Sequence, residues 1–221
     1  MRAAQTMVAL VDAMLCTTAV FLDRMDCERS RAATFKETAL DSLEVFPLSH
    51  CFSYSDGSLF KSAEYARSDD GVVNFTIFGE ATCGDGMQMS RAQFTETSCL
   101  ATPSGAWRGG TCSAAPAPSG ACLVWLFSDD ACSPASLMDG TASFVRPDGA
   151  CRDKRRVSRG AGALEVEVFS DDACGASLAN NTLAYSSATA PRSPFLGGPC
   201  ARYDSGDDPP VAAFARVECF A

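Results

Sequence analysis

Histidine is almost missing from this chain of 221 residues, which contains only His50, and no Cys-x-x-Cys occurs among its cysteines. Zinc sites are usually built from histidine and closely spaced cysteine ligands, so the sequence argues against one. A cysteine nucleophile normally needs a histidine base, and the common hydrolase, phosphate-loop, dinucleotide and metalloprotease motifs are absent. We expect no cofactor, and we interpret His50 as a loop histidine beside Cys51.

A long apolar run is missing as well. No stretch of about 18 apolar residues occurs, so we expect no transmembrane span. Basic residues are outnumbered, with 18 Lys and Arg against 27 Asp and Glu and a net charge of −9. An acidic protein without a basic face is a poor partner for nucleic acid or anionic membranes. Binding to either is therefore not expected.

Cysteine, in contrast, is abundant, and its twelve copies divide into two sets of six. The first set runs from Cys16 to Cys112 and the second from Cys122 to Cys219, which are nearly equal lengths of chain. Such cysteine-rich frameworks persist in oxidising compartments, so we expect disulfide bonds and a secreted or extracellular protein. The pattern predicts a six-cysteine β module at 1–112, a Pro/Ala/Ser linker at 113–121 and a second module at 122–221.

Short segments recur within the two sets. Phe-Ser-Asp-Asp-Ala-Cys occurs at 127–132 and again at 169–174, and 78–83 is a looser copy. Alternating apolar and polar residues at 73–77 and 164–168 are typical of half-buried strands. The fold is therefore expected to be all-β, as two tandem antiparallel β-sandwiches or, alternatively, as one propeller-like closed array of four three-stranded repeats. The clearest helical pattern covers 33–43.

The repeats also suggest a set of disulfides, although six cysteines allow many connectivities. If each subrepeat closes on itself, the bridges are Cys27–Cys51, Cys83–Cys99, Cys132–Cys151 and Cys174–Cys200. The first and last cysteines of each set would then pair as Cys16–Cys112 and Cys122–Cys219.

The N-terminus has mixed character. Met1-Arg2 and the apolar stretch 7–22 resemble a signal peptide, but Asp12 interrupts the stretch and cleavage would remove Cys16. We expect Cys16 to belong to the first strand, with any signal lying upstream of this chain.

Two kinds of charged segment are candidate sites. The acidic pairs are interpreted as turn caps, with weak calcium binding or acid–base catalysis as alternatives; they are Asp129, Asp130, Asp171 and Asp172. The basic stretch beside Cys151 is interpreted as a solvated loop, with proteolytic processing or polyanion binding as alternatives; it contains Arg152, Lys154, Arg155 and Arg156.

Two further features bear on the surface of the protein. Asn74 and Asn180 begin glycosylation sequons, which would be used in a secreted eukaryotic protein. Trp125 and Phe127 lie on one face of an expected strand whose two faces are both apolar. This face is either buried between the modules or exposed as a binding platform for sugar or protein.

No catalytic motif stands out, so the sequence favours a non-enzymatic extracellular module with a structural, adhesion or binding role. Its expected partners are extracellular proteins or glycans. The alternatives are a secreted hydrolase that uses the acidic turns and an inhibitor or effector on a disulfide scaffold.

Overall fold

The computed structural model describes residues 14–220, apart from 34, 36–37, 39–42, 55–58, 85, 113–118, 189–197 and 207–211. The signal-like residues 1–13 and most of the expected linker lie outside the described residues. Strands account for 57% of the structure and helical segments for 7%, which confirms the expected all-β class. We call residues 14–112 the first half and residues 119–220 the second half.

Each half contains eight strands. Those of the first half are β1 (Leu15–Phe21), β2 (Leu43–Pro47), β3 (Cys51–Ser53), β4 (Ser62–Arg67), β5 (Val72–Phe78), β6 (Gln88–Thr95), β7 (Leu100–Ala101) and β8 (Trp107–Thr111). Those of the second half are β9 (Cys122–Phe127), β10 (Leu137–Val145), β11 (Asp148–Arg152), β12 (Arg155–Arg159), β13 (Ala163–Phe169), β14 (Ser177–Ala188), β15 (Ala201–Asp204) and β16 (Ala212–Phe220). A helix, α1 (Arg24–Ala32), follows β1, and a 3₁₀ turn (Pro134–Ser136) precedes β10.

The strands pair in the same order in both halves. In the first half β1 lies between β2 and β8, β7 pairs with β8, and β3 to β6 form a meander. In the second half β9 lies between β10 and β16, β15 pairs with β16, and β11 to β14 form a meander. All of these pairings are antiparallel. The second half adds one more, because β14 also runs parallel to β16.

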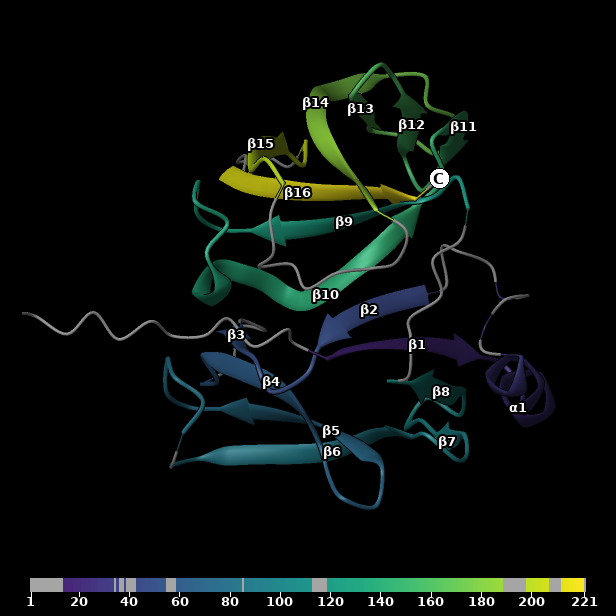
Figure 1. Cartoon of the computed structure of the whole chain (residues 1–221), viewed down its shortest axis with the longest axis vertical. Helices are drawn as coiled ribbons and strands as arrows, with labels where there is room; N and C mark the ends of the chain where they lie inside the picture. Colours follow the sequence, from purple (N-terminus) through teal and green to yellow (C-terminus); the bar gives the residue numbers. More distant parts are fainter. Residues whose placement is uncertain are drawn as a thin grey trace, which may run out of the picture.

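Hydrogen bonds link both halves into one 16-stranded sheet, because β10 pairs with β2 and also runs parallel to β3, through which the β3–β6 meander joins the sheet. This sheet is open, so the alternative prediction of a closed, propeller-like array is wrong. The path through the sheet ends at β7 and β11, which lie toward opposite ends of the molecule (Figure 1) and cannot pair with each other.

The junction of the halves joins matching positions. Phe46 of β2 faces Cys16, and Val145 of β10 faces Cys122. Two residues before these positions stand Glu44 and Ser143, and the two pair with each other across the junction. The pairing is antiparallel, so the strands meet about a local two-fold axis that passes between Glu44 and Ser143.

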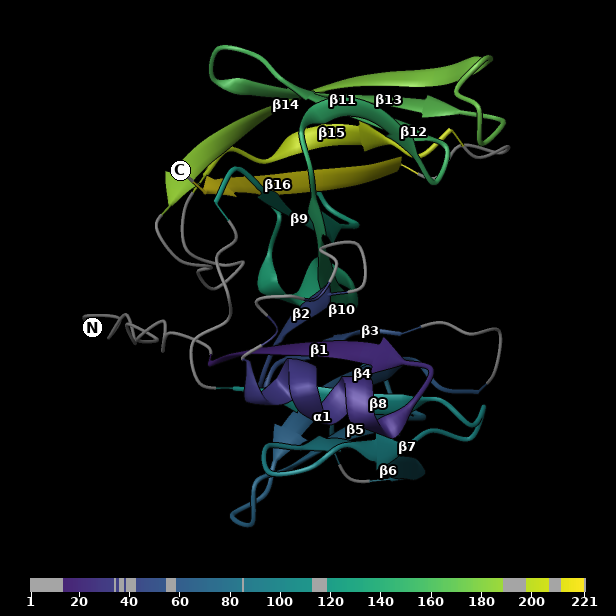
Figure 2. The same cartoon turned by 90° about the vertical axis from the view of Figure 1, so that its right-hand side faces the viewer.

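Three apolar clusters hold the layers together. One crosses the junction and brings Val45 and Phe52 of the first half together with Trp125 of the second. Another lies within the first half and includes Phe46 of β2 and Phe94 of β6. The third lies within the second half, where Val166 and Leu183 of the meander pack with residues of β15 and β16. In Figure 2 the β11–β14 meander accordingly forms a layer above β9, β15 and β16.

All twelve cysteines form disulfides, and the bridges are nested in the same way in each half. In the first half the bridges are Cys16–Cys112, Cys27–Cys99 and Cys51–Cys83; in the second they are Cys122–Cys219, Cys132–Cys200 and Cys151–Cys174. The outermost bridge joins Cys16 of β1 to Cys112, directly after β8, in the first half, and Cys122 of β9 to Cys219 of β16 in the second; the Cα–Cα distance is 4.0 Å in both. These two outer pairings agree with the sequence prediction.

The four predicted inner pairings, Cys27–Cys51, Cys83–Cys99, Cys132–Cys151 and Cys174–Cys200, are wrong. They assumed that each subrepeat closes on itself, whereas each meander folds back and brings its own two cysteines together. The remaining two cysteines of each half lie outside the meander and meet each other. Cys27 on α1 reaches Cys99 above Gly109 of β8, where a Cβ atom would lie only 2.9 Å from the sulfur of Cys27.

The sequence analysis did not predict the helix α1, and the helix that it expected at 33–43 is wrong where the structure describes that stretch. Asp23 caps the helix by accepting a hydrogen bond of 2.9 Å from the backbone N–H of Asp26. Ala33 already ends the helix, and Leu43 begins β2. The other residues of that stretch lie partly outside the described residues.

Candidate functional sites

The two identical acidic segments form the same turn. The carboxylate of Asp171 accepts hydrogen bonds from the backbone N–H groups of Ala173, Gly175 and Ala176 at 3.0–3.1 Å. The carboxylate of Asp129 accepts from the N–H and the hydroxyl of Ser133. In each turn the cysteine three residues later adopts a positive φ, 47° at Cys132 and 53° at Cys174. The first aspartate of each pair therefore caps its turn, as the leading sequence interpretation has it.

These bonds make Asp171 a contributor to stability that depends on pH. Hydrogen bonds from Gly175 and Ala176 lower the pKa of the Asp171 carboxyl group from its usual value of 3.8. Its contribution is therefore complete above pH 3.8 and is lost as the pH falls through the lower, folded-state pKa. We predict that Asp171→Asn lowers the melting temperature at pH 7. The melting temperatures at pH 7 and pH 3 should also lie closer together in this variant than in the wild type. Asp172→Asn is the matched control, and an equal effect of both substitutions would contradict the capping role.

The calcium alternative gains no support from the described residues, among which no three His, Cys, Asp or Glu side chains gather as a metal site. The oxygens of Asp129 and Asp171 are already engaged by donors within their own turns. No geometry for metal binding or for a paired acid and base therefore emerges at Asp129, Asp130, Asp171 or Asp172.

The basic stretch forms a tight hairpin. Asp153 and Lys154 turn the chain between β11 and β12 with φ values of 45° and 59°, as a two-residue turn with left-handed residues requires. Arg152 makes a bidentate pair with Asp148 at 2.7 and 2.8 Å. Arg156 pairs with Glu167 at 3.0 Å. Two of the four basic side chains proposed as a patch are thus already neutralised.

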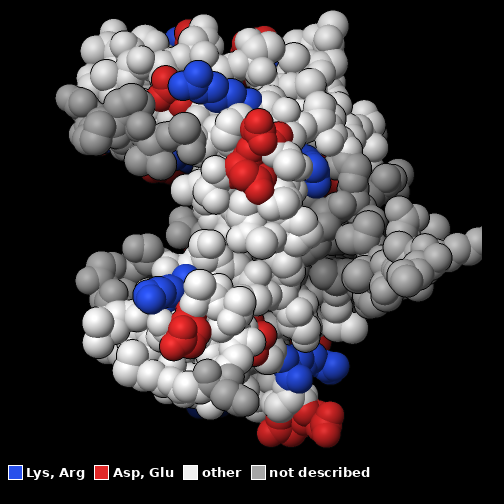
Figure 3. All heavy atoms as spheres, turned by 90° about the vertical axis from the view of Figure 1, so that its left-hand side faces the viewer, with Lys and Arg blue, Asp and Glu red and all other residues white. Residues whose placement is uncertain are grey.

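This geometry bears on both functional alternatives for the basic stretch. Arg155 and Arg156 lie in β12, which pairs with β11 on one side and β13 on the other. A protease that reads an extended chain would have to open this hairpin first. On the face shown in Figure 3, basic and acidic groups are interspersed among uncharged surface. Neither processing nor polyanion binding is favoured by this arrangement.

Trp125 and Phe127 do not form a binding face, because both side chains are 0% exposed. They belong to the apolar cluster that crosses the junction, with Phe52 of the first half. The platform interpretation is therefore wrong. β9 is apolar on both faces because it is central, with the junction cluster on one side and the layers of the second half on the other.

The two sequons differ in exposure. Asn180 is exposed on β14, and the hydroxyl of Thr182 donates to Glu165 at 2.8 Å. Asn74 is half-buried on β5, which is flanked by β4 and β6. Asn180 is therefore the more accessible acceptor for a glycan.

His50 lies at the contact between the halves. Its Nε2–H donates to the carbonyl oxygen of Pro134, at 2.7 Å. Burial lowers the pKa of His50 from its usual value of 6.5, and the bond to Pro134 opposes this only in part. His50 thus serves as a structural link in the fold.

The lowered pKa of His50 predicts a loss of stability in weak acid. The unfolded chain takes up the proton near pH 6.5, whereas the folded protein resists it, so stability is complete above pH 6.5 and falls as the pH drops toward the folded-state pKa. We expect the urea midpoint of the wild type to decrease between pH 7.5 and pH 5, and His50→Gln to reduce this decrease. An unchanged slope in His50→Gln would contradict the prediction.

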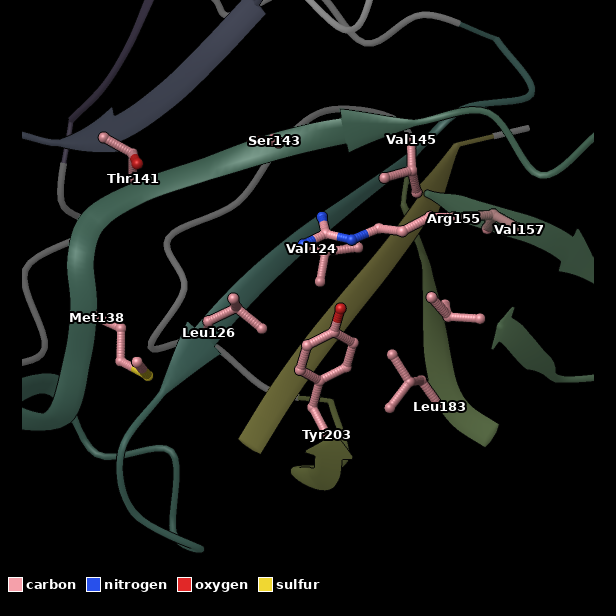
Figure 4. A pocket seen from close by; sticks show the side chains of 11 residues that line it. Val124, Leu126, Met138, Thr141, Ser143, Val145, Arg155, Val157, Leu183 and Tyr203 are labelled. Carbon is pink, nitrogen blue, oxygen red and sulfur yellow. The ribbon is translucent and has the colours of Figure 1, made fainter. Parts of the chain in front are cut away.

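A cavity of about 180 Å³ opens between the two layers of the second half. β9 and β10 contribute Val124, Leu126, Met138 and Val145. The meander contributes Val157, Val166 and Leu183. Figure 4 shows the labelled side chains among them, such as Leu126, Val157 and Leu183, around a common space. Seven of the eleven lining residues are apolar, so the cavity is mainly apolar.

Four polar residues complete the lining of the cavity. Thr141 and Ser143 lie on β10, Tyr203 comes from β15, and Arg155 comes from the start of β12. Figure 4 shows Arg155 extending toward Val124, with the hydroxyl group of Tyr203 directed to the same region. Tyr203 is only 5% exposed, whereas Ser143 is exposed and lies at the rim. The arrangement combines an apolar interior with a cationic group.

Sequence reasoning did not find this cavity, although part of the signal was present. It treated the basic stretch as one loop, whereas residues 155–159 form β12, whose one apolar residue is Val157. Arg155 lies on the same face of β12 as the buried Val157, two residues away, and it lines the mouth of the cavity although its side chain is exposed; Arg156 lies on the other face. The other lining residues come from strands far apart in sequence and carry no common motif.

Comparison with protein-family profiles, with curated proteins and with solved structures found no match to this chain. Neither helical segment in the described part of the chain is long and apolar enough to cross a membrane.

Proposed function

We propose that the chain is a secreted or extracellular, non-enzymatic binding protein built from two tandem six-cysteine units. One observation carries the proposal: all twelve cysteines are bridged, in two nests that connect first to sixth, second to fifth and third to fourth. Frameworks of this density persist in oxidising surroundings and are typical of small extracellular scaffolds.

The strand order supports the tandem arrangement. The described part of each half has eight strands whose antiparallel pairings follow the same order, and Glu44 meets Ser143 at matching positions across the junction. We infer units at 1–112 and 122–221 joined by the linker at 113–121. Each unit is a small two-layered sandwich in which the meander is one layer.

The contacts at the acidic turns favour binding over catalysis. A general acid–base pair needs two carboxyl groups that face a common substrate space. Asp129 and Asp171 instead direct their oxygens to donors within separate turns. The protein would bind extracellular proteins or glycans through its loops. If it were instead an inhibitor or effector on the same scaffold, it would use the same surfaces.

The proposal is tested by secreting the chain from eukaryotic cells behind an added signal peptide. Peptide mapping without reduction should recover both nests, and titration should find no free thiol. The purified protein should bind on a glycan array or a panel of extracellular proteins and show no turnover in a hydrolase panel. Free sulfurs in the native protein would contradict the extracellular assignment. Turnover that is lost in Asp129→Asn would favour the hydrolase.

The same expression experiment tests the sequons. Because Asn180 is exposed and Asn74 is half-buried, we predict a glycan at Asn180. Asn180→Gln should remove the mass that a glycosidase releases, and Asn74→Gln should leave it unchanged. The assignment would be contradicted if Asn74→Gln lost the glycan and Asn180→Gln kept it.

A further inference from the structure

We propose that the cavity in the second half binds a small monocarboxylate with an apolar body, whose carboxylate pairs with Arg155. This inference goes beyond the protein and glycan binding proposed above, and it does not depend on that role or on the tandem arrangement. It concerns one preformed site and the ligand chemistry that its lining selects.

The size of the cavity sets the body of the ligand. Its volume of about 180 Å³ exceeds that of an engineered apolar cavity of about 150 Å³ that stays dry and binds benzene. Val166 and Leu183 of the meander face Leu126 of β9 across this space, and all three are apolar. A phenyl ring or a short alkyl chain would therefore fit between the layers and be removed from water.

The charge state of the basic hairpin distinguishes Arg155 from its neighbours. Arg152 pairs with Asp148, Arg156 pairs with Glu167, and Arg159 stacks over the ring of Tyr185 at 5.6 Å. Among the residues that the structure describes, the side chain of Arg155 takes part in no ion pair, hydrogen bond or ring contact. Arg155 lines the cavity at its mouth, where its side chain is exposed to solvent and to an entering ligand.

The residues that line the cavity determine the sign of the charge on the ligand. Of the described residues that line the cavity, Arg155 alone carries a charge. A carboxylate is the natural partner because the guanidinium group can bind both of its oxygens. The hydroxyl of Tyr203 is directed to the same region and could add a further donor (Figure 4). Since the chain has a net charge of −9, attraction of an anion must come from this local group rather than from the overall field.

The probe is 3-phenylpropionate, and its neutral amide is the control ligand because it lacks the charge. Binding of each compound to the isotopically labelled full chain is measured by NMR titration. The acid should shift signals of Leu126, Val166 and Tyr203, and the amide should bind about tenfold more weakly or worse. Arg155→Gln should weaken binding of the acid by a similar factor. Arg156→Gln, which removes the neighbouring charge on the opposite face, should change it by less than about twofold.

Ser143→Trp provides a second check, because Ser143 is exposed at the rim and a large side chain there would close the mouth of the cavity. This variant should fold and lose the shifts produced by the acid. Shifts outside the cavity only, equal affinity for acid and amide, or equal losses in Arg155→Gln and Arg156→Gln would each overturn the proposal. None of these outcomes would alter the disulfide map or the glycan array that test the proposed function.

Discussion

Replacing Gly140 with alanine is expected to destabilise the protein by about 3 kcal/mol or more, because two costs add at this position. The backbone of Gly140 has a φ of +63°, which an alanine adopts only with strain. A Cβ atom there would also lie 2.2 Å from ring atoms of Phe52. Phe52 belongs to the first half and is 1% exposed, so its ring cannot move without disturbing the cluster that joins the halves.

Gly149→Ala separates these two costs. Gly149 has a φ of +75° with no atom within 4 Å of the added Cβ, so this variant reports backbone strain alone. Urea unfolding with the disulfides intact should show a clearly larger loss for Gly140→Ala than for Gly149→Ala. The double variant Phe52→Ala/Gly140→Ala should lose less than the sum of the single variants. Equal losses for the two alanine variants would show that Phe52 does not constrain Gly140.

The second large effect is expected from the outermost bridge of the second half. Closing a loop of 97 residues in isolation would contribute about 4.7 kcal/mol by the chain-entropy relation. The Cys132–Cys200 bridge lies inside this loop and closes 68 residues of it, so the unbridged path is only 29 residues long. We therefore expect Cys122→Ala/Cys219→Ala to cost about 3.6 kcal/mol in the otherwise bridged protein. Both cysteines are buried, and any cavity would add to this loss.

Nesting makes this effect depend on the inner bridges. In a background that lacks Cys132–Cys200 and Cys151–Cys174, removing Cys122–Cys219 should cost about 1 kcal/mol more than in the complete protein. Denaturant unfolding of the four combinations without reductant measures the difference. The same cost in both backgrounds would mean that the bridges act through native contacts rather than through the dimensions of the unfolded chain.

Local patterns in the sequence predicted the local structure well. The alternation at 73–77 and 164–168 corresponds to β5 and β13. The acidic segments form turns because an aspartate followed by small residues can accept bonds from the N–H groups ahead of it. The two outer bridges were also predicted correctly, on the assumption that the first and last cysteines of each set close its ends.

Other features required the arrangement of strands in space. The inner disulfides depend on how each meander folds back, which no spacing rule specifies. Because both faces of β9 are apolar, Trp125 had either to be covered by a neighbouring layer or to be exposed on one face. The sequence did not distinguish these two alternatives. The cavity is assembled from β9, β10, β12, β13, β14 and β15, so no continuous segment could reveal it.

The pairing of Glu44 with Ser143 across the junction has a consequence for larger assemblies. A contact between equivalent edges is isologous, and it saturates once two copies have met. In the proposed tandem arrangement, a third unit would therefore find no vacant edge of the same kind from which to extend the sheet. If a longer polypeptide carried more such units, they would be organised as a string of pairs rather than as a continuous fibre.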